Sequence, residues 1–407
     1  MMRVTMSGKL SKLRLSCGTA ATRKRLIRLW GLVLLLAVSA MSNERSQSKQ
    51  TQREQRGVKP VLSLSDANRP LLSYDGQRIV VMPEVGVVEV YETSTKRKVQ
   101  TFRVPNAGDY AIDADGSHVG IWGESITPVD DRHYKSKAVF WLFEVDTGRE
   151  VRHNDAVIMR DGVRVGFLDA LHNSKNVSRD LRLVANLAPS EKMVPSVTLG
   201  NLETLELVRQ FSFGEYSKSG VAGTVAMTPD AKVIAATRRD LYGSNCKQTV
   251  AWDASTGREL LRLPFEVISI SLSSDGGRLA INDSQGDNYI VEIWSLENGK
   301  RISEIGLEFG PRRHIIGGGT LSPDGKLLAT TRRNYLLLWD VDSGRLAAAQ
   351  PVTDASDDTV KSLSFSGDGR FVATGTLSEE VRIWQVAEIL KKSQISNIPS
   401  FVRKLSQ

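Results

Sequence analysis

Three arginine pairs stand out in this chain as groups that could bind an anionic partner. With two nearby tyrosines they form one candidate binding set: Arg238, Arg239, Tyr242, Arg312, Arg313, Arg332, Arg333 and Tyr335. A planar guanidinium pairs well with carboxylates and phosphates, and Arg and Tyr are enriched in the energetic centres of protein interfaces. The set predicts a surface for an acidic protein or peptide. The alternative is ordinary loop charge balanced by neighbouring aspartates: Asp130, Asp131, Asp240, Asp283 and Asp287.

Motifs for metal binding and catalysis are missing from the sequence. The run Asp113-Ala114-Asp115-Gly116 begins like a calcium loop, but the glutamate that such a loop needs further on is absent. The five histidines show no metal-ligand spacing. There is no Gly-x-Ser-x-Gly, His-Glu-x-x-His, P-loop or dinucleotide-binding glycine motif. We therefore expect no metal, no cofactor and no catalytic residues.

The candidate set lies between copies of a repeated unit, which must supply the elements that position it. The clearest copy is Ser322–Arg345, which contains the turn Pro323-Asp324-Gly325, two short apolar strands and Trp339. Proline presets one φ angle of such a turn, and glycine supplies a positive one. Strands this short are not stable alone, so the copies must stack on one another.

Two anchors recur along the chain. The first is an Asp-Gly hairpin or a weakened form of it: Asp75-Gly76, Asp115-Gly116, Asp180-Leu181, Asp230-Ala231, Asp275-Gly276, Asp324-Gly325 and Asp368-Gly369. The second is an aromatic residue followed five positions later by Gly and then Arg or Lys, as at Phe143, Trp252, Trp294 and Trp339. The mean spacing of about 49 residues exceeds the roughly 40 to 45 of a common propeller repeat. We expect the excess to lie in loops.

The repeated unit resembles the WD40 family. The resemblance covers residues 58–390 and implies an all-β fold, a WD40-like β-propeller of seven four-stranded blades. Six or eight blades stay open at this point, because the third unit is placed by spacing. The sequence has no Gly-His pair, and Arg333 and Ser378 stand six residues before Trp339 and Trp384, where the family has Asp. We therefore expect blades held by packing and strand pairing, without the family's buried hydrogen-bonded network.

The two ends of the repeat region predict how the ring closes. Val58–Leu64 has the pattern of an extra strand before the first unit, whereas the last unit, Val360–Val386, shows only three strands. The resemblance implies that the first segment supplies the outer strand of the last blade, which satisfies two sheet edges at once. The segment from Ala387 to Gln407, which includes the C-terminal tail at residues 391–407, would then lie outside the ring and start as a short helix through Lys392.

Residues 1–40 resemble a targeting segment. They carry eight Lys or Arg and no acid, and they end in the apolar run Leu29–Ala40. A basic stretch, a short apolar run and small residues near the cut are typical of a secretory signal, and twelve apolar residues are fewer than the about 20 that span a bilayer. An uncleaved signal anchor is the second interpretation and an organellar transit peptide the third. Residues 41–57 are polar and predict a flexible linker.

The charge and cysteine content limit the partners of the folded part. The chain has a net charge of +8, and removing the eight charges of residues 1–40 leaves zero, so we expect no nucleic acid. Cys17 lies in the targeting segment and Cys246 stands alone in the repeat region, so no disulfide is expected within the mature domain.

The propeller resemblance implies where the candidate set would lie. Loops between the second and third strands of a blade share one side of the ring with the loops between blades. The insertions occur there: Gly123–Lys137, Ala188–Ser196, Arg238–Gln248 and Asn282–Tyr289. We therefore predict an exported or membrane-tethered, monomeric, non-catalytic scaffold that binds a protein or peptide through these loops. The alternative is an exported propeller enzyme of the hydrolase or lactonase kind, with its site at the mouth of the central channel.

Overall fold

The computed structural model describes residues 58–392 with short gaps. The gaps are 131–132, 157–158, 161–162, 165–175, 190–194, 205, 215–219, 241–247, 265–266, 268, 286–287, 309–318 and 356–357. The predicted targeting segment, the linker and the tail beyond Lys392 therefore lie outside the described residues. So do Tyr242, Arg312 and Arg313 of the candidate set.

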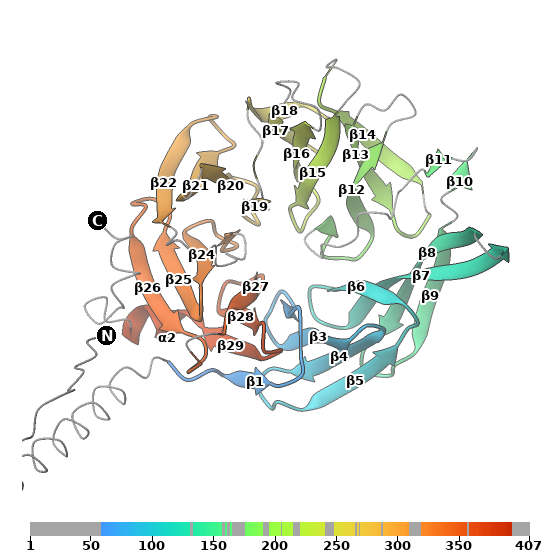
Figure 1. Cartoon of the computed structure of the whole chain (residues 1–407), viewed down its shortest axis with the longest axis horizontal. Helices are drawn as coiled ribbons and strands as arrows, with labels where there is room; N and C mark the ends of the chain where they lie inside the picture. Colours follow the sequence, from blue (N-terminus) through green and yellow to red (C-terminus); the bar gives the residue numbers. More distant parts are fainter. Residues whose placement is uncertain are drawn as a thin grey trace, which may run out of the picture. The chain divides into compact units, whose positions relative to one another are not determined.

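Residues 58–392 form a ring of seven antiparallel blades, which confirms the predicted β-propeller (Figure 1). Blade 1 is β2 (Leu71–Leu72), β3 (Arg78–Glu84), β4 (Val87–Glu92) and β5 (Lys98–Arg103). Blade 2 is β6 (Ala107–Ile112), β7 (His118–Asp130), β8 (His133–Glu144) and β9 (Glu150–Ala156). Blade 3 is β12 (Leu183–Pro189), β13 (Pro195–Asn201) and β14 (Leu207–Ser212). In blade 3 an isolated bridge from Val177 to Val184 takes the place of the innermost strand. A small hairpin, β10 (Met159–Arg160) and β11 (Val163–Arg164), separates blades 2 and 3.

Blades 4 to 7 have four strands each, as blades 1 and 2 do. Blade 4 is β15 (Gly220–Met227), β16 (Val233–Asp240), β17 (Gln248–Asp253) and β18 (Glu259–Leu263), and blade 5 is β19 (Ser269–Leu272), β20 (Arg278–Gln285), β21 (Asn288–Ser295) and β22 (Arg301–Glu308). Blade 6 is β23 (Thr320–Leu321), β24 (Leu327–Arg332), β25 (Tyr335–Asp340) and β26 (Leu346–Pro351). Blade 7 is β27 (Val360–Phe365), β28 (Phe371–Thr376), β29 (Val381–Gln385) and β1 (Leu62–Leu64), followed by helix α2 (Val386–Lys392).

The first strand closes the ring as predicted. β1 pairs antiparallel with β29, and Leu62 lies opposite Ile383. Leu62 is buried in a cluster that contains Ile79 of blade 1 and Ile383 of blade 7. The side-chain amide of Gln350 also accepts the backbone N–H of Val58 at 2.9 Å and donates to the carbonyl of Val58 at 3.2 Å. The last blade is therefore completed by residues from the start of the repeat region.

A hydroxyl and an aspartate hold the inner hairpin of six blades in the same way. The hydroxyl donates to the aspartate at 2.5 to 2.8 Å and accepts a backbone N–H five residues further on at 2.8 to 3.0 Å. The pairs are Ser73 with Asp75, Ser178 with Asp180, Thr228 with Asp230, Ser273 with Asp275, Ser322 with Asp324 and Ser366 with Asp368. Blades 3 and 4, which lack the glycine, keep the turn because Leu181 and Ala231 adopt φ angles of 56° and 57°. The weakened anchors are thus structurally equivalent to the glycine forms.

Arginine side chains bond across neighbouring blades on the side of the ring that carries these hairpins. Arg78 donates to the carbonyl of Gly116 at 2.7 Å and pairs with Asp146 of blade 2. Arg278 of blade 5 does the same with Gly325 and Asp342 of blade 6. A charged donor to a backbone carbonyl fixes one hairpin against the next.

The buried tryptophans correct one expectation. Trp339 donates its indole N–H to Thr330 at 2.9 Å, and Trp384 donates to Thr374 at 3.0 Å. All four side chains are buried. Blades 6 and 7 therefore keep the Trp and Thr half of the hydrogen-bonded network that we expected to be missing, because that half does not depend on the absent Asp and His.

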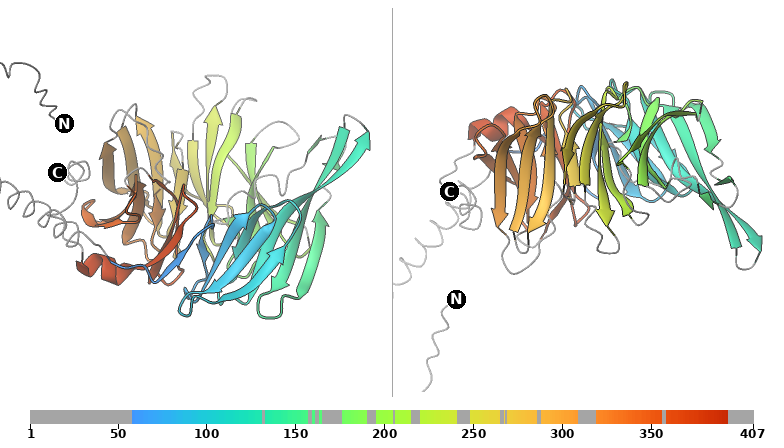
Figure 2. Two further views of the ribbon diagram at one scale, coloured as in Figure 1. Left: turned by 60° about the horizontal axis from the view of Figure 1, so that its bottom comes forward. Right: turned by 90° about the horizontal axis from the view of Figure 1, so that it is seen from above.

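The extra length of the repeat lies partly in strands, which corrects the expectation that it lies in loops. The segment Gly123–Lys137 continues β7 and β8, which stay paired as far as Asp130 opposite His133. Figure 2 shows this hairpin projecting beyond the rest of its blade. Ala188–Ser196 and Asn282–Tyr289 likewise contain paired residues of β12 with β13 and of β20 with β21.

Candidate functional site

One side of the ring carries the turns between second and third strands together with the loops between blades, as the resemblance implied. The backbone N–H of Val360 donates to Arg333 at 2.9 Å, and that of Val352 donates to Asn334 at 2.7 Å. We call the described turns and loops on this side in blades 6, 7 and 1 the loop rim: residues 333–334, 352–355, 358–359, 377–380, 65–70 and 85–86. The backbone N–H of Leu377 donates to the carbonyl of Thr359, and that of Ala67 donates to the carbonyl of Glu379, both at 2.8 Å. These hydrogen bonds connect the turns of the loop rim from blade 6 to blade 1.

The structure separates the residues of the candidate set. Arg238 is fully buried within β16, opposite Ala222 and Gln248, which corrects its expected place in an exposed loop. Strand β16 runs on to Asp240, so the backbone of Arg239 is paired with Val221 rather than free in a loop. The reason is that the pairing of β16 with β17 continues beyond the apolar residues, which end at Ala236, through Thr237 and Arg238.

The described remainder of the set lies at one turn of blade 6. Arg332 ends β24 and is paired with Tyr335, which begins β25. Arg333, in the turn between them, has a φ angle of 53°. All three side chains are half-buried, and burial raises the pKa of Tyr335. The structure thus brings together Arg332, Arg333 and Tyr335, and it places Arg238 in the interior.

The loop rim exposes apolar side chains that sequence reasoning did not single out. Val85 of blade 1 is 78% exposed and Leu377 of blade 7 is 52% exposed. Near them, Asp66, Arg69 and Glu379 have positive φ angles, as Arg333 does. Such angles are uncommon in residues other than glycine and mark backbone that the surroundings hold in place.

The other candidate surface is the mouth of the central channel, on the opposite, hairpin side of the ring. A cavity of about 200 Å³ is lined by residues from all seven blades. Its opening is surrounded by the residue that precedes the hairpin aspartate in each blade, and we call these seven residues the mouth residues: Tyr74, Ala114, Arg179, Pro229, Ser274, Pro323 and Gly367. All seven are half-buried, whereas the hairpin hydroxyl residue before each of six of them is buried.

Backbone bonds between blades fix the mouth residues. Tyr74 donates its N–H to Ala114 at 3.0 Å and accepts one from Asp368 at 2.8 Å. Arg179 donates its N–H to Pro229 at 2.7 Å, and Ser274 donates to the next blade in the same way. The mouth therefore has a rigid backbone, and its chemistry depends on the side chains.

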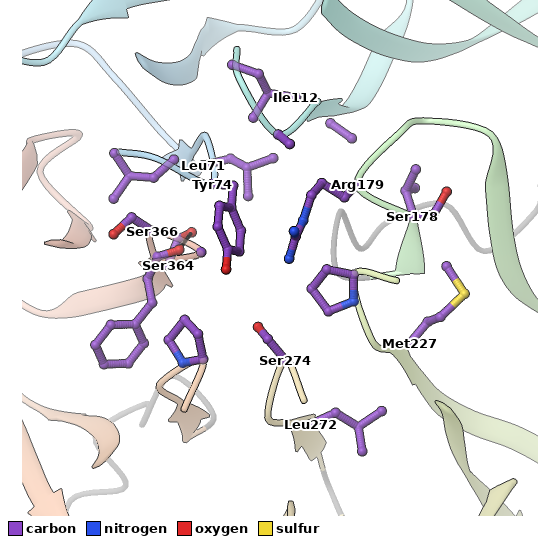
Figure 3. A pocket seen from close by; sticks show the side chains of 18 of the residues that line it. Leu71, Tyr74, Ile112, Ser178, Arg179, Met227, Leu272, Ser274, Ser364 and Ser366 are labelled. Atoms are coloured by element: carbon purple, nitrogen blue, oxygen red, sulfur yellow. Dashed lines mark hydrogen bonds between the residues drawn. The ribbon is translucent and has the colours of Figure 1, made fainter. Parts of the chain in front are cut away.

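Three polar side chains point into the opening from blades 1, 3 and 5 (Figure 3). The guanidinium carbon of Arg179 lies 3.6 Å from the centroid of the Tyr74 ring, a close cation–π contact. The hydroxyl of Ser274 points toward the space between them. Nε of Arg179 is buried and has no hydrogen-bond partner among the described residues.

An acidic hollow of about 400 Å³ adjoins the cavity and shares five lining residues with it: Asp113, Ala114, Ser178, Arg179 and Pro229. Its carboxylates are Asp113, Asp115, Asp180 and Asp230. Asp113 contacts His118 at 2.9 Å, and burial raises the pKa of Asp113. Asp230 pairs with Lys232 at 3.0 Å. Asp115 and Asp180 form no ion pair among the described residues, so this hollow carries negative charge beside a single arginine.

Sequence reasoning named the channel mouth as an alternative site but identified none of the mouth residues, because they are spread over the whole ring and differ in type. The signal that could have found them is positional: each directly precedes an anchor aspartate already identified. Within the described part of the chain, no group of three or more His, Cys, Asp or Glu residues is arranged to hold a metal ion. None of the helices described there has the length and apolar character needed to cross a bilayer.

Comparisons with known proteins agree with this architecture. The family description "WD domain, G-beta repeat" matches residues 350–385, from the end of β26 to the end of β29. A search of curated proteins finds no match. A solved chain from "Crystal Structure of Mitotic Checkpoint Complex" is 14% identical, with a TM-score of 0.54, over 81% of this chain and 93% of that one. Residues 350–385 match one WD40 repeat, and the chain that contains them folds as a β-propeller of seven blades.

Proposed function

We propose that this propeller is a non-catalytic platform that binds a protein or peptide on the loop rim. The observation that carries the proposal is the pair of exposed apolar side chains, Val85 and Leu377, on turns whose backbones are bonded to their neighbours. Rigid loops lose little conformational entropy when a partner binds. Apolar anchors surrounded by polar groups are typical of the centre of a protein interface.

Charged groups beside these anchors would set the preference for a partner. Arg332, Arg333 and Tyr335 stand at the blade 6 end of the loop rim, and Arg69 is exposed at the blade 1 end. These are the side chains that favour an acidic partner segment. The similarity to the solved chain, at 14% identity, supports the propeller fold alone, so the proposal of a protein partner rests on the exposed apolar side chains and the charged groups beside them.

The proposal predicts that a photo-crosslinking residue at Leu377 captures a specific protein partner. Leu207, on the outer strand β14, is a matched control because it is 55% exposed, against 52% for Leu377. The cross-linked adduct should form from position 377 and not from 207. With the identified partner purified, Leu377→Asp should weaken binding by about 30-fold or more, the loss typical of an interface hot spot. Equal adducts from both positions, or unchanged affinity, would remove the loop rim as the binding surface.

We also propose that residues 1–40 direct export of the propeller. The support is their sequence alone: eight basic residues, no acid and a short apolar run. Expression in a secreting bacterial host should give a soluble product that begins near Met41. A membrane-bound product that keeps the apolar run would instead mean a tethered propeller, and a cytoplasmic product of full length would contradict export.

Catalysis at the channel mouth is the competing function. The described lining of the cavity contains one carboxyl, Asp113, and that group is in contact with His118. Most of the lining consists of aliphatic and hydroxyl side chains. We therefore have no specific observation in favour of a hydrolytic site and retain the binding platform.

A further inference from the structure

We propose that the channel mouth is a second binding site, for a small zwitterion of the amino-acid class. Its carboxylate would be held by Arg179, Ser274 and the hydroxyl of Tyr74, and its ammonium group would face the carboxylates of Asp115 and Asp180. This site lies on the hairpin side of the ring and is independent of the loop rim.

The first argument concerns the hydrogen-bonding groups of Arg179, Tyr74 and Ser274. Buried polar groups in folded proteins are almost always hydrogen-bonded, and each exception requires an explanation. The buried Nε–H of Arg179 is such an exception, because it has no acceptor among the described residues. Tyr74 and Ser274 are half-buried and carry hydroxyls that can donate to the same ligand. All three point into one opening (Figure 3). A ligand that brings acceptor oxygens would satisfy them together.

The second argument is the geometry of Arg179. With its guanidinium carbon 3.6 Å from the centre of the Tyr74 ring, one side of the group is in contact with the aromatic face. A stacked guanidinium keeps its N–H groups available at its edge, where they match the two oxygens of a carboxylate. The ring also limits the rotation of the arginine, so less entropy is lost when the ligand binds.

The third argument is charge. A free anion that approaches Arg179 meets the acidic hollow, where Asp115 and Asp180 form no ion pair among the described residues. Repulsion from these carboxylates disfavours a simple anion, and the single arginine disfavours a simple cation. A molecule with a carboxylate and an ammonium group close together matches both parts of the site. The hollow and the cavity share five lining residues, so one ligand can contact both: Asp113, Ala114, Ser178, Arg179 and Pro229.

The fourth argument is size. The part of the site inside the channel, the cavity of about 200 Å³, is smaller than the roughly 300 to 1,000 Å³ of pockets for larger ligands, whereas the hollow of about 400 Å³ beside it is the part that would receive the ammonium group. An amino acid has few heavy atoms, and its side chain can extend either along the channel, lined by Leu71, Leu272 and Phe365, or outward into solvent. The apolar lining favours a small apolar side chain.

The test begins with the full chain and an equimolar mixture of the common amino acids, observed by saturation-transfer NMR. At least one amino acid should receive transfer, and calorimetry should then give its affinity. Its N-acetyl derivative, which lacks the ammonium group, and its amide, which lacks the carboxylate, should each bind at least about tenfold more weakly. If no amino acid receives transfer, or if the N-acetyl derivative binds equally well, the zwitterion proposal is wrong.

Two variants and one control assign the site. Arg179→Met should reduce affinity by about 10- to 150-fold, the range for a hydrogen-bonded charge. Arg182→Met is the control, because Arg182 is exposed in the same hairpin and lies outside the cavity. Gly367→Ala should also reduce affinity, because the new Cβ would lie 1.8 Å from Cδ2 of Tyr74 and must displace the ring.

The variants also separate this site from the loop rim. Cross-linking from position 377 should be unchanged in Arg179→Met, and thermal unfolding of each variant checks that it is folded. Wild-type affinity in a folded Arg179→Met protein would overturn the assignment, whereas failure of the cross-linking experiment would leave it unaffected.

Discussion

Leu62→Asp should lower the free energy of unfolding by more than about 4 kcal/mol, because it places a charge where the ring closes. Leu62 is 1% exposed and packs with residues of both blade 7 and blade 1, including Ile383 and Ile79. Removing a buried leucine side chain alone costs about 2 to 5 kcal/mol, and an unpaired buried carboxylate adds to that. The change also weakens the pairing of β1 with β29.

The neighbouring residue offers a matched control. Ser63 lies in the same strand opposite Arg382, but its side chain is exposed because successive residues of a strand face opposite sides. Ser63→Asp should change the stability by less than about 0.5 kcal/mol, as is usual for surface positions. Urea unfolding followed by tryptophan fluorescence measures both variants. Similar losses for the two would mean that Leu62 is not the side chain that closes the ring.

Asp109→Asn should stabilise the protein at neutral pH and have little effect in acid. Asp109 lies in β6, is 7% exposed, and accepts the N–H of Tyr110 at 2.9 Å through one carboxyl oxygen. The other oxygen is buried without a hydrogen-bond partner among the described residues. Burial raises the pKa of Asp109 from 3.8 to about 7, and the hydrogen bond from Tyr110 and the charge of nearby Arg69 only partly offset this.

The direction of the pH dependence follows from the raised pKa. Below about pH 4 the carboxyl is protonated in both the folded and the unfolded chain, so its ionisation does not lower the free energy of unfolding. Between pH 4 and about 7 the folded chain holds a proton that the unfolded chain has lost, so stability falls as the pH rises. A shift of this size corresponds to at most about 4 kcal/mol. Asparagine keeps the acceptor for Tyr110 and does not ionise.

The measurement is urea unfolding of the wild type and of Asp109→Asn at several pH values from 5 to 8. The stability difference between them should grow with pH through this range and level off near its upper end. Asp66→Asn is the control, because Asp66 is exposed in an inter-blade loop, and it should leave the slope unchanged. A constant difference across the range would mean that Asp109 does not titrate as described.

The repeat pattern was sufficient to predict the fold because it is local and redundant. Each anchor aspartate and each following turn residue stands within one hairpin, so a copy can be recognised without its neighbours. Even Leu181 and Ala231 in place of glycine did not hide two of the hairpins, since the aspartate and its hydroxyl partner are retained. The closure by β1 followed from a missing strand at the other end.

The candidate site was less predictable, for physical reasons that particular residues show. Arg238 was expected in a loop because its neighbours are polar, but pairing along a sheet depends on the partner strand as much as on composition. The same limit applies to the long β7 and β8 hairpin. Tyr74 and Arg179 come from different blades, and nothing in either hairpin specifies that the other lies 3.6 Å away. Only the ring brings them together.

The arrangement of the mouth residues has a consequence for how such a protein diversifies. The hairpin bonds between hydroxyl and aspartate do not use these seven side chains, so evolution can exchange them while those bonds persist. The exchange is not fully independent: a Cβ at position 367 would overlap the ring of Tyr74, so these two positions are expected to covary. A lineage that acquires a larger residue at position 367 should lose the aromatic at 74 and, with it, the platform on which Arg179 rests.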